Sequence, residues 1–369
     1  MDNFSTELLN WYEHNRRILP WREDPSPYHV WLSEIMLQQT RVEAVRDHYL
    51  RFIGSLPDIE SLAEAPEDTY LKLWEGLGYY SRVRNLHKAA SVIMKDYNGK
   101  MPGSFTELLK LPGVGPYTAA AIASIAFGTA VPAVDGNLLR IFARLTGYAE
   151  NIKSPSAQKA AVQFYKERMP AAGSFLRPSD SGITDATDSA DVQGNPCGDF
   201  NQALMDLGAA VCLPNSDPQC GHCPLSGTCR IHIDMPGMES SLPVMPERKE
   251  KRTEDLTVFV IRSGDKTAVR KRPSRGLLAG LYELPNAKGT LDDEGALEWL
   301  RAHSVEPLRI RRIGEAEHIF THKVWKMHGY LVSADPFYEE KIPFIMASWK
   351  EIRERYSIPS AFAAYLKLI

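Results

Sequence analysis

Residues 111–121 read LPGVGPYTAAA, and this short stretch decides how the rest of the chain is interpreted. Two glycines two positions apart permit a tight turn, and Pro116 suits the first residue of a helix. The peptide N–H groups of Gly113, Val114 and Gly115 would then lie at a helix N-terminus, where they can bind a phosphate. A simple corner between two helices explains the same glycines, so both interpretations stay open for this stretch alone.

The first 230 residues around this turn show helical periodicity nearly throughout. A short helix before the turn and a longer one after it predict a helix-hairpin-helix at about residues 105–127. Further upstream, Ser26-Pro27 is a helix start signal, and apolar positions continue from there to Phe52 as in one helix. The sequence therefore predicts an all-helical N-terminal domain over residues 1–232.

Two segments interrupt or end the helical pattern. Residues 176–196 are rich in Ser, Asp, Gly and Thr and poor in large apolar side chains, which predicts a flexible insertion. Prolines and the charge run PERKEKR predict a linker at 233–253. Beyond it, runs such as LTVFVIRSGDKTAVRKR predict strands, and SAFAAYLKLI predicts a terminal helix. Residues 254–369 are therefore expected to form a mixed α/β domain.

The composition excludes several classes of protein. The chain of 369 residues carries a formal net charge of −3, which gives no bulk sign of a nucleic-acid binder. No apolar run approaches the length of a membrane span, and the N-terminus lacks a secretory signal pattern. We therefore expect a cytoplasmic protein without a membrane partner, whose cysteines stay reduced.

Four of the five cysteines, Cys212, Cys220, Cys223 and Cys229, lie within eighteen residues. In a reducing compartment this density predicts a metal site rather than disulfides, and four thiolates can complete a tetrahedral set. A zinc site would favour two Cys-x-x-Cys pairs, whereas the uneven spacing found here suits one loop around a single compact cluster. Cys197, assigned to the polar insertion, is expected to take no part.

Asp135 in VPAVDGN lies twenty residues after Gly115, and an aspartate directly before a helix is most often its N-cap. The order of features is more informative: a helix-hairpin-helix, a loop ending in aspartate, then a four-cysteine cluster. This order resembles the helix-hairpin-helix base-excision DNA glycosylases of the endonuclease III superfamily. The resemblance implies a two-lobed helical domain, bound double-stranded DNA, one 4Fe–4S cluster held by the four cysteines, and a nucleotide flipped out of the duplex.

Tyr117 distinguishes two branches of that superfamily. In the bifunctional members a lysine at this hairpin position attacks the sugar and forms a Schiff base, which leads to strand cleavage. A phenol cannot form an imine. Tyr117 therefore predicts a monofunctional enzyme that uses water.

Several stretches resemble the MutY-type adenine DNA glycosylases in particular. By this resemblance Glu34 is the general acid that protonates a ring nitrogen of adenine, and Asp135 stabilises the oxocarbenium ion. Asn137 and Tyr117 would position these groups and the water, and partial burial could raise the pKa of Glu34. The stretches are LPWR (19–22), WLSEIMLQQTRV (31–42), WEGLGYYSRVRNLH (74–87), VDGN (134–137) and FNQALMDLGA (200–209).

The remaining site residues of this domain follow from the same resemblance. It places Trp21, Arg22 and Gln202 in the adenine pocket. Taken alone, Tyr79 fits equally well as a core aromatic residue, and Arg82 as part of a solvated helix face. Contacts with DNA, including a tyrosine that wedges between bases, are expected from Gln38, Gln39, Thr40, Tyr79, Arg82, Gly113, Val114 and Gly115.

Residues 254–369 resemble the C-terminal domain of the same family, which is related to Nudix pyrophosphohydrolases. The segment NAKGTLDDEGALEWLRAH lacks the glutamate-rich pattern that holds Mg²⁺ in a working Nudix enzyme, so a lesion-reading role is expected. By the resemblance, Phe320, Thr321 and His322 stand where a Phe-Ser-His turn contacts 8-oxoguanine. An ordinary β-hairpin with an exposed histidine is the alternative.

The sequence thus predicts a monofunctional adenine DNA glycosylase, a monomer that acts on adenine opposite 8-oxoguanine or guanine. Two alternatives stay open. One is an endonuclease III-like glycosylase with lyase activity, which Tyr117 disfavours. The other is a non-catalytic iron–sulfur protein that binds DNA through the hairpin. The first cysteine gap is one residue longer than the usual family pattern, so the loop must accommodate an extra residue between Cys212 and Cys220.

Overall fold

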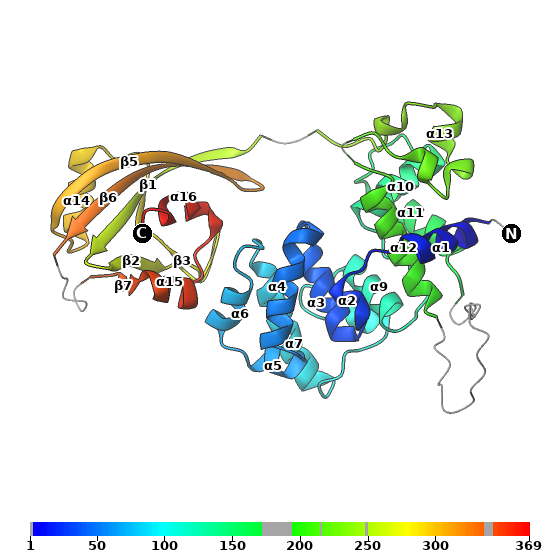
Figure 1. The fold of residues 1–369 in the computed structure, drawn as a ribbon, viewed down its shortest axis with the longest axis horizontal. Helices are drawn as coiled ribbons and strands as arrows, with labels where there is room; N and C mark the ends of the chain where they lie inside the picture. The colour runs from blue at the N-terminus through cyan, green and yellow to red at the C-terminus, as the bar shows by residue number, and fades with distance from the viewer. Residues whose placement is uncertain (1–2, 172–193, 215, 248–249, 336–341) are drawn as a thin grey trace. The chain divides into compact units, whose positions relative to one another are not determined.

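The computed structural model describes residues 3–171, 194–214, 216–247, 250–335 and 342–369. The chain divides into two compact units (Figure 1). One is helical and contains residues 1–63 and 85–247; the other contains residues 64–84 and 248–369. In the part of the chain that the structure describes, none of the helices combines the length and apolar character that a membrane span requires.

The helical unit confirms the predicted all-helical character of the N-terminal part. Helices α5 (Ile59–Glu64) and α7 (Ser81–Asp96) carry the chain across the unit boundaries. The helices wholly within this unit are α1 (Phe4–Asn15), α2 (Pro20–Glu23), α3 (Pro27–Leu37), α4 (Val42–Ser55), α8 (Phe105–Leu108), α9 (Pro116–Ile125), α10 (Gly136–Thr146), α11 (Pro155–Arg168), α12 (Pro196–Ala210) and α13 (Arg230–Asp234).

The segment from Ser26 to Phe52 is two helices, α3 and α4, and not the single helix that was predicted. Gln39 lies between them with a φ of 59°, a left-handed conformation that an α-helix cannot continue through. Apolar spacing does not reveal the break, because both helices keep an apolar face toward the protein interior. The break has a use: it brings Thr40 to the cavity described below.

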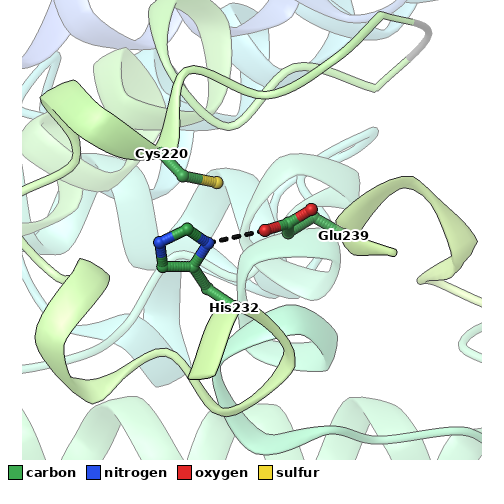
Figure 2. Close-up of side chains that lie close together, drawn as sticks. All are labelled: Cys220, His232 and Glu239. Carbon is green, nitrogen blue, oxygen red and sulfur yellow. Dashed lines mark hydrogen bonds and ion pairs between the residues drawn. The ribbon is translucent and has the colours of Figure 1, made fainter. Parts of the chain in front are cut away.

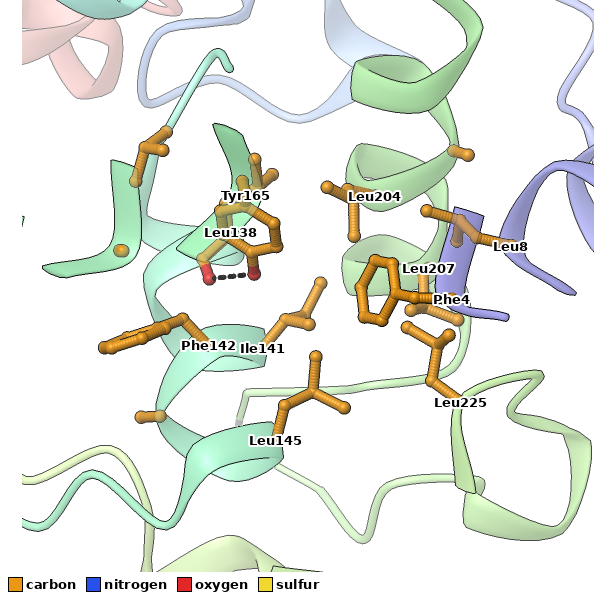
Figure 3. Packing of buried hydrophobic residues seen from close by; sticks show 14 of the residues in the cluster. Phe4, Leu8, Leu138, Ile141, Phe142, Leu145, Tyr165, Leu204, Leu207 and Leu225 are labelled. Atoms are coloured by element: carbon orange, nitrogen blue, oxygen red, sulfur yellow. Dashed lines mark hydrogen bonds between the residues drawn. The ribbon is translucent and has the colours of Figure 1, made fainter. Parts of the chain in front are cut away.

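The main core of the helical unit lies between α1, α10, α11 and α12 (Figure 3). Tyr165 of α11 is fully buried and donates a hydrogen bond to the carbonyl oxygen of Leu138 at 2.7 Å. Because α12 packs against α9 as well as α10, it joins the hairpin to this core. On α10, apolar side chains three and four residues apart form one buried face: Leu138, Ile141, Phe142 and Leu145.

The predicted insertion at 176–196 falls mostly outside the described residues, but its last residues belong to α12. Asn195 caps this helix by accepting a hydrogen bond from the Gly198 N–H at 2.8 Å. Cys197 lies in the first turn, fully buried, and its thiol donates to the carbonyl oxygen of Pro170 at 3.4 Å. The assignment of Cys197 to the polar insertion was therefore wrong, because tertiary packing makes it a core residue.

The second unit confirms the predicted α/β domain and is built on a seven-stranded mixed sheet with the path β3-β2-β1-β6-β5. The central strands β1 (Arg252–Ser263) and β6 (Lys323–Ala334) run parallel, and β5 (Pro307–Ile319) is antiparallel to β6. The other elements are α6 (Glu67–Leu73), β2 (Lys266–Lys271), β3 (Tyr282–Glu283), β4 (Asn286–Lys288), α14 (Asp293–Ala302), β7 (Ile345–Ser348), α15 (Trp349–Arg355) and α16 (Ala363–Leu366).

Two apolar cores stabilise this sheet. On α14, Trp299 stacks on Phe259 of β1 with ring centroids 4.3 Å apart. In the second core, Trp325 of β6 packs with Phe362 and Tyr365 from the C-terminal segment. That segment was predicted to be one helix, but it is a 3-10 turn followed by the four-residue α16, and its apolar residues fill the core instead of continuing a helix.

Candidate active site and cysteine loop

A cavity of about 390 Å³ lies in the helical unit, and residues from α2, α3, α4, α9, α10 and α12 meet in its wall. Its size falls within the range of small-molecule and cofactor sites. Both predicted carboxylates and all the predicted pocket residues line this cavity, so the fold gathers seven candidates from separate elements: Trp21, Arg22, Glu34, Tyr117, Asp135, Asn137 and Gln202.

Glu34 is the most buried charged group of the cavity wall, with 5% of its surface exposed. The phenol of Tyr117 donates a hydrogen bond to its Oε2 at 2.5 Å. Burial raises the pKa of Glu34 to about 7; the bond from Tyr117 and the charge of Arg22 lower it, while Asp135 raises it. A pKa raised this far lets the carboxyl hold a proton near neutral pH, which a general acid must do.

Tyr117 reaches the cavity because the hairpin starts α9 directly before it. Gly115 is the N-cap, Pro116 the first helical residue, and Tyr117 the second. Burial raises the pKa of Tyr117 well above its ordinary value, and the charge of Glu34 raises it further. The phenol therefore stays protonated and can act only as a neutral hydrogen-bond donor to Glu34.

Asp135 is both an N-cap and a cavity residue, so the two interpretations of this aspartate are compatible. Its Oδ1 accepts hydrogen bonds from the N–H groups of Asn137 at 2.9 Å and Leu138 at 2.8 Å. Its Oδ2 accepts one from the side-chain amide of Asn137 at 2.9 Å. Burial raises the pKa of Asp135, and these bonds oppose the rise. The cap holds the carboxylate in a fixed orientation toward the cavity.

Arg17 and Asp206, which were not among the predicted site residues, extend the site. Asp206 of α12 is 1% exposed and accepts two hydrogen bonds from Arg22, at 2.8 and 2.9 Å. Its Oδ1 also accepts from Nε of Arg17 at 2.7 Å. Both arginines line the cavity. The available signal was Asp206 inside FNQALMDLGA, an acidic residue among apolar ones, but nothing local indicated its partners.

The hairpin takes the conformation that its glycines predicted. Gly113 has a φ of 76°, and a Cβ there would lie 2.6 Å from Cβ of Asn85, so only glycine fits. The N–H of Val114 donates to the carbonyl oxygen of Leu111 at 3.1 Å and is therefore not free to bind a phosphate. Within the described chain, the N–H groups of Gly113 and Gly115 have no hydrogen-bond partner.

The segment Gln38–Thr40 follows the break after α3. Gln38 donates a hydrogen bond to the Thr118 hydroxyl at 3.3 Å, which connects this segment to α9. Gln39 is exposed in its left-handed conformation. Thr40 lines the cavity. Of these three residues, only Thr40 is part of the cavity wall, and the DNA contacts expected for the segment stay a prediction.

Tyr79 and Arg82 lie in the second unit. Tyr79 has a φ of 45°, rare for a tyrosine, and its side chain is 47% exposed. Arg82 is buried: its guanidinium donates to the carbonyl oxygens of Leu77 at 2.9 Å and Gly78 at 3.2 Å, and burial lowers its pKa to about 10. Arg82 thus stabilises the loop that presents Tyr79, and the solvated helix face proposed for it does not apply.

Phe320, Thr321 and His322 form the turn between β5 and β6. Phe320 packs edge-on against Trp325 with centroids 4.8 Å apart, which anchors the turn, while Thr321 and His322 are exposed. Within the same unit, the hydroxyl oxygens of Thr321 and Tyr79 are 2.5 Å apart. The two segments singled out for base stacking and lesion contact are therefore hydrogen-bonded to each other.

The four clustered cysteines line a small apolar cavity of about 30 Å³. Arg144 donates to Sγ of Cys212 at 3.3 Å, and its buried Nη2 has no partner among the described residues. Burial raises the pKa of the Cys220 thiol to about 11 and that of Cys223 to about 12, so binding a metal centre there must displace protons. An anionic sulfur-ligated group fits this site, because it would accept a hydrogen bond from the unpartnered Nη2 of Arg144.

One further ligand set overlaps this loop. Figure 2 shows Cys220, His232 and Glu239 pointing toward one another, with ligand atoms within 4.8 Å. Nδ1 of His232 and Oε1 of Glu239 are 2.6 Å apart. Because Cys220 already belongs to the four-cysteine set, these residues form the border of that site and not a separate one.

Arg140 connects the cysteine loop with the active site. Its Nε donates to the carbonyl oxygen of Cys212 at 2.9 Å, and Nη2 donates to that of Gly208 at 2.8 Å. The same Nη2 also donates to Oδ1 of Asn137 at 3.0 Å, and Asn137 in turn donates to Asp135. Hydrogen bonds through Arg140 and Asn137 therefore connect Asp135 with the cysteine loop.

Comparison with known proteins identifies the family of each part of the chain. Residues 32–167 match the HhH-GPD superfamily of base excision DNA repair proteins, and residues 257–368 match the NUDIX domain family. A solved thermostable thymine-DNA glycosylase superposes with a TM-score of 0.52 at 28% identity, covering 63% of this chain and 95% of that one. The fold and the site thus define a base-excision glycosylase of the helix-hairpin-helix class.

Relatives that match most of this chain identify the family within this class. The chain is 32% identical to the adenine DNA glycosylase of Buchnera aphidicola subsp. Baizongia pistaciae, over 86% of this chain and 83% of that protein. It is 33% identical to the adenine DNA glycosylase of Mus musculus, over 90% of this chain and 71% of that protein. The chain belongs to the adenine DNA glycosylase family.

Proposed function

We propose that this protein is a monofunctional glycosylase that hydrolyses the N-glycosidic bond of adenine paired with 8-oxoguanine or guanine. Membership of its family makes it a DNA N-glycosylase. The observation that supports a hydrolytic, non-lyase reaction is the Tyr117–Glu34 hydrogen bond of 2.5 Å inside the cavity. A phenol stands beside the acid, and no lysine is among the described residues that line the cavity.

The cavity supplies two carboxyl groups with separate roles. Protonated Glu34 donates its proton to a ring nitrogen of adenine, which turns the base into a neutral leaving group. Asp135, ionised and fixed by its cap, stabilises the positive charge that develops on the sugar. Tyr117 holds Glu34 in place. Water then adds to the sugar, and Glu34, left ionised, can take up its proton.

We propose that the four clustered cysteines hold one 4Fe–4S cluster. The apolar cavity between the thiols and the free donor of Arg144 support this. When bound, the cluster cross-links the loop and supplies structural rigidity. Arg140 then transmits the position of the loop to Asn137 through the hydrogen bonds described above.

We propose that the substrate is double-stranded DNA, bound by a monomer. The free N–H groups of Gly113 and Gly115, at the start of α9, suit a phosphate contact. The exposed ring of Tyr79 suits insertion between bases. The turn Phe320–His322 would read the base opposite adenine, with Thr321 and His322 supplying polar atoms. A cytoplasmic location stays a prediction.

A duplex with adenine opposite 8-oxoguanine tests the proposal. We expect strand breaks only after hot alkali, because base loss without lyase chemistry leaves the backbone intact. Cleavage without alkali, together with a complex trapped by borohydride, would contradict the monofunctional reaction. Glu34→Gln and Asp135→Asn should each abolish base release while duplex binding persists. Unchanged base release in both variants would contradict the catalytic roles of the two carboxyls, whereas duplex binding without base release in the wild type would favour a protein that only clamps DNA.

A further inference from the structure

Asp206 is the least exposed carboxylate associated with the active-site cavity, although it does not line the cavity itself. Its side chain is 1% exposed, and both oxygens accept hydrogen bonds from arginines. Arg17 adds its backbone N–H, which donates to Oδ2 at 3.1 Å. The guanidinium of Arg22 also donates to the carbonyl oxygen of Arg17 at 3.2 Å, which closes the cluster.

The two arginines outnumber the carboxylate, so the cluster keeps one net positive charge. Burial works against ionising Asp206, but the bonds and charge of Arg22 and then Arg17 lower its pKa below the ordinary value, so it is ionised. Arg17 and Arg22 are among the residues that line the cavity, whereas Asp206 is not. The net positive charge of the cluster is therefore carried by residues of the cavity wall.

We propose that Asp206 is a positioning residue: it fixes Arg17 and Arg22 in the cavity wall so that their net positive charge faces Glu34. This inference rests on the proposed role of Glu34 as general acid. Proton transfer to adenine leaves Glu34 negative, and a fixed positive charge nearby stabilises that product. Asp206 also offsets one of the two positive charges and thereby limits the repulsion between the arginines.

The charged groups that face Glu34 come from several elements. Tyr117 approaches from α9, Asp135 from the start of α10, and Arg22 from α2. Arg41 and Glu43, at the start of α4, line the same cavity with opposite charges. Asp206 influences Glu34 through the two arginines, and its removal makes the wall more positive.

Two substitutions test the proposal through opposite effects. Asp206→Asn removes the negative charge at nearly constant shape, so the pKa of Glu34 should fall. The alkaline limb of the pH–rate profile for adenine release should move to lower pH by about half a unit or more. Arg17→Gln removes a positive charge, so the same limb should move to higher pH. General destabilisation cannot produce shifts of opposite sign.

Glu283→Gln is the matched control, because Glu283 is 2% exposed and also pairs with two arginines, Arg270 and Arg272, but in the second unit. It should lower the thermal midpoint and leave the pH–rate profile of single turnover in place. Coincident profiles for wild type and Asp206→Asn, or a shift of Arg17→Gln in the same direction, would overturn the proposal. If Asp206→Asn does not fold, the direction of the Arg17→Gln shift decides.

A wild type that releases no adenine would refute the proposed function and not this inference. Infrared titration of the Glu34 carboxyl, assigned with Glu34→Gln, then measures the same shifts without turnover. Unchanged titration midpoints in both variants would refute the positioning role.

Discussion

Glu34→Gln should make the protein more stable at alkaline pH while it abolishes base release. Burial holds the pKa of Glu34 at about 7 in the folded chain, against an ordinary value of 4.5. The folded state therefore keeps a proton that the unfolded chain loses as pH rises from 4.5 to 7. Stability falls across this window and levels off above it.

The magnitude follows from the same two values. At about 1.4 kcal/mol per pKa unit, ionising the buried carboxyl costs about 3 kcal/mol above pH 7. Glutamine keeps an oxygen that can accept the Tyr117 bond but carries no charge. The stability gain of the variant should thus be near zero at pH 4.5 and about 3 kcal/mol at pH 8. At about 2–4 °C per kcal/mol, the thermal midpoint should rise by several degrees.

Thermal melting of wild type and Glu34→Gln at pH 4.5 and pH 8 measures this difference, with adenine release followed in parallel. The rate of the variant should fall by about 100-fold or more, the usual contribution of a general acid. Equal stability gains at both pH values, or a loss at pH 8, would refute the reasoning, since the carboxyl would then not be ionised at a cost. Asp135→Asn is a useful comparison, because hydrogen bonds already oppose the pKa rise there.

Three further predictions concern the hairpin, the cysteine loop and the turn Phe320–His322. Gly113→Ala should destabilise the fold by about 1–3 kcal/mol, because Gly113 has a φ of 76° and an added Cβ would lie 2.6 Å from Asn85. Gly115→Ala should cost less than about 1 kcal/mol, because no atom lies near the added Cβ. Equal unfolding midpoints for the two variants would contradict this. Arg144→Met should lower the visible absorbance of the proposed cluster per protein chain. It removes the hydrogen-bond donor to Sγ of Cys212 and leaves the carbonyl oxygens of Leu213 and Leu242 without that partner. Full absorbance would show that the loop holds its cluster without this residue. Thr321→Val keeps the side-chain shape but loses the hydrogen bond to Tyr79. The ratio of the rates of adenine release opposite 8-oxoguanine and opposite guanine should therefore fall. An unchanged ratio would exclude a role for the Thr321 hydroxyl.

Much of the helical unit could be predicted from local sequence signals, because those signals act over a few residues. Glycine at 113 is required by backbone geometry, and Asp135 caps the helix that follows it. The cavity could be anticipated only through the resemblance, since its residues come from six separate helices and the loops between them. Apolar periodicity did not predict the break near Gln39, because the helices on both sides of it keep an apolar face toward the protein interior.

The sequence by itself determined the all-helical character of the first domain and the hairpin turn. It also determined tyrosine in place of lysine at position 117 and the grouping of four cysteines, since each depends on residue identity and close spacing. Tertiary structure decided which ionisable side chains are buried and which charged groups pair with one another. The pKa of Glu34 is raised because packing removes its carboxyl group from water, and Arg82 stabilises a loop because its guanidinium is buried. Asp206 lies 189 residues from Arg17, so no local signal connects them. Desolvation and pairing depend on which distant segments meet, and only the folded chain sets this.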